Sequence, residues 1–115
     1  MGLVLSVEFE ATVKDEAGAI NAMKQKIERD MKNGTVDYSL EKNLERGVGT
    51  ETLEDLIRIF LSGTRSKEEV VRDGNHITFQ SDFDASYGWE RVMLEMYDEI
   101  IPYLEPGSSL NVEAW

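Results

Sequence analysis

Strict alternation of apolar and polar side chains over residues 3–13 is the feature that most restricts how this chain can fold. The odd positions are all apolar, and the even positions are polar apart from Val4. A period of two places these sets on opposite faces of a β-strand, one of which faces a core. The segment therefore predicts a half-buried strand, whose buried side chains are Leu3, Leu5, Val7, Phe9, Ala11 and Val13.

Helical and strand patterns follow one another along the rest of the chain. Asp15 can cap a helix in which Ile20, Met23, Ile27 and Met31 recur at intervals of three or four residues. Asp-Gly between two later apolar runs predicts a hairpin turn. The expected elements are strand 3–13, helix 16–32, an irregular connection 35–49, helix 50–62, strands 68–72 and 76–83, a helix from Ser86 that Pro102 ends or kinks, and strand 110–114.

The order of these elements predicts an α+β fold in a single domain spanning 1–115. Without the helix at 50–62 the order is βαββαβ, which is that of ferredoxin-like domains. We therefore expect a ferredoxin-like sandwich with an extra helix inserted in the first crossover. Both crossovers should place their helices on one face of a four-stranded antiparallel sheet. The first and last strands are expected to be central and paired with each other.

Negative charge dominates the composition and is unevenly distributed. The chain carries a net charge of -11, and residues 73–115 hold nine acidic residues against one basic residue, Arg91. Such a surface repels nucleic-acid phosphates and anionic membranes, and it attracts basic partners. We therefore expect no direct nucleic-acid binding and no membrane association. The chain has no cysteine, which excludes disulfides and thiolate chemistry and favours a cytoplasmic setting.

Three features of the sequence bear on catalysis or metal binding, and each favours a structural interpretation. His76 follows the predicted hairpin turn, and the sequence offers it no orienting partner or nucleophile. Residues 82–86 resemble the opening of a calcium loop, but Tyr87 and Met93 stand where that loop needs Gly and Glu. Residues 47–49 precede a helix without the lysine of a phosphate-binding loop. We therefore predict no catalytic residues, no metal and no cofactor.

Carboxylates on the last predicted helix allow two interpretations. They form either an ordinary solvated face or an acidic recognition strip. The scarcity of basic residues nearby in the sequence favours the strip, and exposed aromatic side chains could anchor a partner beside it. The predicted partner-binding residues are Asp82, Asp84, Tyr87, Glu90, Glu95, Tyr97, Asp98, Glu99 and Trp115.

Protein binding is the function that this composition favours. We expect a small acidic inhibitor or immunity-type protein that docks on a basic partner, such as a nucleic-acid-handling enzyme. The composition is similar in character to that of phage and mobile-element inhibitors, including DNA mimics that block restriction or CRISPR nucleases. Two alternatives stay open. One is a homodimeric structural domain using its open sheet face, with Val4 and Trp115 in the contact. The other is an enzyme, small-molecule or metal site between sheet and helices.

Overall fold

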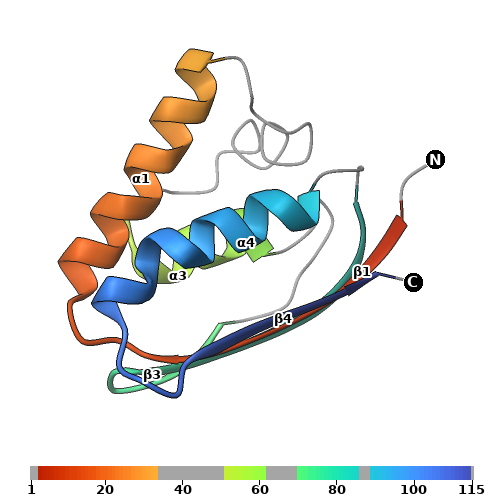
Figure 1. The fold of residues 1–115 in the computed structure, drawn as a ribbon. Coiled ribbons are helices and arrows are strands. Elements are labelled where there is room, and N and C mark those ends of the chain that lie inside the picture. The colour runs from red at the N-terminus through yellow and green to blue at the C-terminus, as the bar shows by residue number, and fades with distance from the viewer. Residues whose placement is uncertain (1–2, 34–50, 62–69, 86–88, 115) are drawn as a thin grey trace.

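A four-stranded antiparallel sheet with three helices on one of its faces forms the fold (Figure 1). The computed structural model describes residues 3–33, 51–61, 70–85 and 89–114. The strand order is β2-β3-β1-β4. In chain order the elements are β1 (Leu3–Thr12), α1 (Glu16–Asn33), α3 (Leu53–Leu61), β2 (Val71–Asp73), β3 (His76–Ala85), α4 (Trp89–Ile100), the 3-10 turn η1 (Ile101–Tyr103) and β4 (Ser109–Ala114).

The central strand β1 confirms the alternation predicted for residues 3–13. It pairs antiparallel with β3 from Leu3↔Ala85 to Thr12↔His76 and with β4 from Leu5↔Ala114 to Glu10↔Ser109. The pairing expected between the first and last strands is therefore confirmed, but the central position expected for the last strand is wrong. Because β3 pairs with β1 over ten residues and takes the second inner position, β4 forms an edge.

Buried side chains from the helices and from one face of the sheet form the hydrophobic core. Leu5, Val7, Phe9 and Ala11 of β1 lie there with Ile77 and Phe79 of β3. One apolar stripe of α4 is buried, and every residue of α3 except Glu54, Asp55 and Arg58 is buried. The α4 stripe consists of Trp89, Val92, Met93, Met96 and Ile100.

Local sequence signals set the ends of several elements. Asp15 caps α1 as predicted, since its Oδ1 accepts the Gly18 amide hydrogen at 3.0 Å. Thr52 Oγ1 accepts the Asp55 amide hydrogen at 3.1 Å at the start of α3. The hairpin turn between β2 and β3 uses Gly74 at a φ of 61°.

Some expected boundaries differ from the structure. The described part of the strand expected at 68–72 is the short β2, and Pro102 lies in η1, which follows α4 directly. Met31 is 58% exposed, because the core-facing stripe of α1 ends at Ile27. The connection expected at 35–49 lies outside the described residues, as does the predicted helix start at Ser86.

Candidate functional site

The face of the sheet opposite the helices carries acidic and uncharged polar side chains. Even-numbered residues of β1 place Ser6, Glu8, Glu10 and Thr12 there, and the antiparallel register aligns them with side chains of the neighbouring strands. No lysine or arginine occupies a described position of this face. We call this surface the open face, and its described polar side chains are Ser6, Glu8, Glu10, Thr12, Asp73, His76, Thr78, Gln80, Asp82, Ser109, Asn111 and Glu113.

Two shallow hollows lie on the open face. The first runs across the sheet from Val71 of β2 to Asn111 of β4, and the Glu8 and Glu10 side chains line it. The second lies along β1 and β4, where Glu8 and Glu113 are among its lining residues. The carboxylates thus border recesses that side chains of a bound molecule could enter.

His76 lies on the open face between two side chains that sequence reasoning did not assign to it. Its Nδ1 is 3.0 Å from Thr12 Oγ1, and its Nε2 is 3.0 Å from Glu10 Oε2. In general-base catalysis a carboxylate orients an imidazole, and the imidazole takes the proton of a hydroxyl nucleophile. Glu10, His76 and Thr12 provide these three groups in this order. The His76 and Glu10 side chains are 46% and 59% exposed, however, so water screens both groups. This exposure favours a surface polar cluster over a catalytic site.

The acidic strip predicted on α4 is partly neutralised by basic side chains of α1. Lys26 Nζ lies 3.2 Å from Glu95 Oε1, and Arg29 pairs with Glu99. The hydrogen bond that Arg29 donates to the Glu99 carboxylate raises the pKa of Arg29. The expectation that almost no basic residue neutralises the strip is therefore wrong for Glu95 and Glu99, because their partners come from a helix distant in the sequence.

The remaining predicted partner-binding residues are dispersed. Glu90 and Asp98 are exposed on α4, and no described basic side chain forms an ion pair with either. Tyr97 is half-buried, with its ring edge-to-face against Phe9 at a centroid distance of 6.2 Å, and burial raises the pKa of its phenol. Asp82 lies on the open face.

Three predicted partner-binding residues have less structural description. Asp84 lies in β3, where its backbone pairs with that of Val4. Tyr87 and Trp115 lie outside the described residues.

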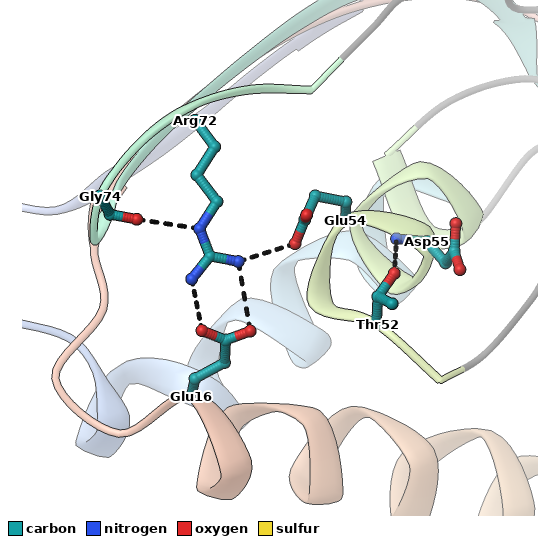
Figure 2. A network of polar contacts seen from close by, with 6 residues as sticks. All are labelled: Glu16, Thr52, Glu54, Asp55, Arg72 and Gly74. Atoms are coloured by element: carbon teal, nitrogen blue, oxygen red, sulfur yellow. Dashed lines mark hydrogen bonds and ion pairs between the residues drawn. The ribbon is translucent and has the colours of Figure 1, made fainter.

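Arg72 forms the most extensive polar network among the described residues, on the helix-covered side of β2 (Figure 2). Its Nε donates to the Gly74 carbonyl at 2.9 Å. Its Nη1 donates to Glu54 Oε1 at 2.8 Å and to Glu16 Oε2 at 3.2 Å. Its Nη2 donates to the other oxygen of Glu16.

Through these contacts Arg72 connects β2 with α1 and α3. Its hydrogen bonds hold the pKa of Glu16 below the ordinary value, and they raise the pKa of Arg72 itself. Glu16 begins α1 and Glu54 lies in the first turn of α3, so both carboxylates also interact favourably with a helix dipole. Because the guanidinium is engaged by both acids, we assign this network a structural role.

Comparisons with other proteins provide no relative from which a function could be inferred, so a functional proposal has to rest on the geometry of the structure. No protein-family model, curated protein or solved structure matches the chain. Within the described ranges, no cluster of three or more His, Cys, Asp or Glu could hold a metal ion. The helices of those ranges are too short or too polar to cross a membrane.

The sequence alone did not predict that the side chains of the open face form one surface. Part of the pattern was nevertheless visible in it. The even positions of residues 3–13 already placed Ser6, Glu8, Glu10 and Thr12 on one side of a strand. The register with β3 and β4 adds Asp82 and the other carboxylates. Pairing of strands that are distant in the sequence was needed to show that these side chains share a surface.

Proposed function

We propose that this chain is an acidic protein-binding domain that acts by binding and not by catalysis. It docks on the basic surface of a partner, in the manner of an inhibitor or immunity-type protein. The observation that carries the proposal is the open face, where carboxylates lie together with no lysine or arginine at the described positions. Besides Asp73 of β2, three adjacent strands supply them. These carboxylates belong to Glu8 and Glu10 of β1, Asp82 of β3 and Glu113 of β4.

Electrostatics explains why such a face suits a basic partner. Like charges held on one surface produce a field that attracts opposite charge, speeds association and repels partners of the wrong sign. A nuclease or other nucleic-acid-handling enzyme presents a basic groove to phosphates, and this protein would act there as a DNA mimic, as some anti-restriction and anti-CRISPR proteins do. The proposed setting is the cytoplasm, where such enzymes act.

Ferredoxin-like architecture with α3 as an inserted helix is part of the same proposal. Antiparallel pairing throughout the order β2-β3-β1-β4 supports it, as do the two connections that carry helices to one face. In this architecture one face of the sheet is not covered by helices, and in this protein that face carries the carboxylates of the open face.

Two matched variants of the protein test where the partner docks. Glu8→Lys with Glu113→Lys reverses charge on the open face, whereas Glu90→Lys with Asp98→Lys makes the same change in net charge on α4. Glu95 and Glu99 are unsuitable for this purpose, because reversing them also breaks contacts with α1.

The measurement is capture of basic proteins from the native host lysate at low and high salt, read by mass spectrometry. Binding of a specific basic partner to the wild-type protein should weaken at high salt. It should be lost in the open-face variant and retained in the α4 variant. Loss in the α4 variant alone would move the docking site to that helix. Equal capture by all three proteins would refute acidic docking.

A homodimer is the second candidate, supported by the 40% exposure of Val4 at one end of the open face. Light scattering separates it from the first candidate. A stable dimer that persists at high salt would favour a self-association role, since the carboxylates of two copies repel each other less when salt screens them.

A further inference from the structure

The two edges of the sheet differ in how well they are protected against pairing with another strand. Strand β2 has three residues and directs the charged Arg72 toward the helices, which are features that discourage pairing. Strand β4 has six residues, each of which pairs with a residue of β1, and it contains neither lysine nor proline. No other strand of the described part pairs with its outer edge. Within the described part of the chain, the outward backbone groups of β4 therefore have no strand partner, which is the condition for adding a strand there.

On the helix side of β4, apolar side chains border this edge. Leu110 and Val112 are half-buried and pack against the core. In Figure 1, α4 lies above β4, on the side of the molecule toward the viewer. Tyr97 of α4 contacts Phe9, which is the cross-strand neighbour of Leu110.

Two exposed apolar residues of the α4–η1 segment continue this border. Leu94 and Ile101 lie three and four residues from Tyr97, so they share its flank of the helix. They are 44% and 46% exposed. The opposite flank, which carries Glu95 and Glu99, faces α1. Leu94, Tyr97 and Ile101 therefore form an apolar strip on the flank of the α4–η1 segment that faces away from α1.

On the open-face side of β4, acidic and amide side chains border the same edge. Asn111 and Glu113 alternate with the apolar residues of β4. The hollow along β1 and β4 brings Glu8 and Ser6 next to them. A strand added to β4 would thus meet apolar groups on one side and carboxylates on the other.

We propose that β4 accepts an extended segment of the partner as a fifth strand, and that this segment alternates basic and apolar residues. The inference rests on the proposed function and specifies how its partner is recognised. Main-chain hydrogen bonds to β4 would supply affinity, and the two borders would select side chains at alternate positions. Basic side chains would lie against Glu113 and Glu8, while apolar ones would lie against the apolar strip of Leu94, Tyr97 and Ile101.

Synthetic peptides test this recognition directly on the full chain. The probe is a capped seven-residue peptide of alternating lysine and valine. A second peptide has the same composition in an order that breaks the alternation, and a third is the alternating peptide with backbone N-methyl groups. Affinities and amide exchange of residues 109–114 are measured by NMR. The alternating peptide should bind at least tenfold more tightly than either control and should protect the outward amides of β4.

A pair of protein variants separates strand addition from simple charge attraction. Leu94→Ser with Ile101→Ser removes two apolar side chains of the strip without changing charge, and Met31→Ser removes a similarly exposed apolar side chain of α1. Binding of the alternating peptide should weaken only in the first variant. Binding of the shuffled peptide should be the same in both.

The outcomes distinguish this inference from the proposed function. Equal affinity of the alternating and shuffled peptides, with shifts spread over the open face, would overturn strand addition and leave acidic docking intact. Absence of binding by any basic peptide at low salt would overturn both. A dimer of the free protein with protected β4 amides would show that a second copy occupies the edge, and it would also overturn the inference.

Discussion

Replacing Arg72 by methionine should lower the stability of the fold by removing the charge that joins β2 to α1 and α3. The Arg72 side chain is 24% exposed, and its partners Glu16 and Glu54 are 42% and 37% exposed. Solvent screening at this exposure limits each carboxylate contact to about 1 kcal/mol. The expected loss is therefore roughly 2 kcal/mol, which for a domain of this length corresponds to a decrease in Tm of about 8 °C.

The same contact should make stability depend on pH in a defined direction. Hydrogen bonding from Arg72 lowers the pKa of Glu16 from its ordinary value of 4.5. A carboxylate whose pKa is lower in the folded state stabilises the fold fully above its unfolded pKa, and this stabilisation is lost as pH falls through the folded value. The difference in unfolding free energy between wild type and Arg72→Met should therefore shrink below about pH 4.5.

Urea unfolding at several pH values measures both effects. Arg91→Met provides the matched control, since Arg91 is exposed on α4 and forms no ion pair among the described residues. Combining Arg72→Met with Glu16→Gln should cost less than the sum of the separate changes, because the two residues share one interaction. The reasoning would be refuted if Arg72→Met cost no more than Arg91→Met, or if its cost were the same at pH 7 and pH 3.

Three further substitutions test the packing. Gly18→Ala should destabilise the protein by about 1–3 kcal/mol, because an added Cβ would lie 2.5 Å from the Tyr103 ring; calorimetry should show part of this loss restored by Tyr103→Leu. Ser81→Ala should cost about 1 kcal/mol in urea unfolding, since its hydroxyl donates to the Leu61 carbonyl at 2.7 Å; an unchanged midpoint would count against that bond. Leu56→Ala should cost about 2–5 kcal/mol if α3 belongs to the core, and a smaller loss would mean that α3 packs only loosely.

Local periodicity predicted the elements well because it reports which face of each one is buried. The alternation corresponds to a buried face from Leu5 to Val13, and the apolar residues of α1 up to Ile27 follow the helical spacing predicted for them. The position of β4 at an edge was not predictable in this way. Alternating apolar and polar residues are compatible with either an edge strand or an inner strand. The two differ only in whether a second strand pairs with the other side of β4.

Charge neutralisation was misjudged because it depends on tertiary neighbours. Lys26 and Glu95 are 69 residues apart in the sequence, and Arg29 and Glu99 are 70 apart. A count of charges along residues 73–115 cannot include such partners. The contacts of His76 with Glu10 and Thr12 were missed for the same reason, since β1 and β3 meet only in the folded sheet.

The place of β1 in the sheet also has a consequence for how the chain acquires its structure during synthesis. Its partners begin at His76 and extend to Ala114. At roughly ten residues per second, the ribosome needs several seconds to add these strands after β1 has been made. Throughout that interval the apolar face of β1 has no sheet to join. Ribosome-bound fragments that end before β3 should therefore bind chaperones and resist folding, whereas release of the longer chain should allow rapid closure around this first strand.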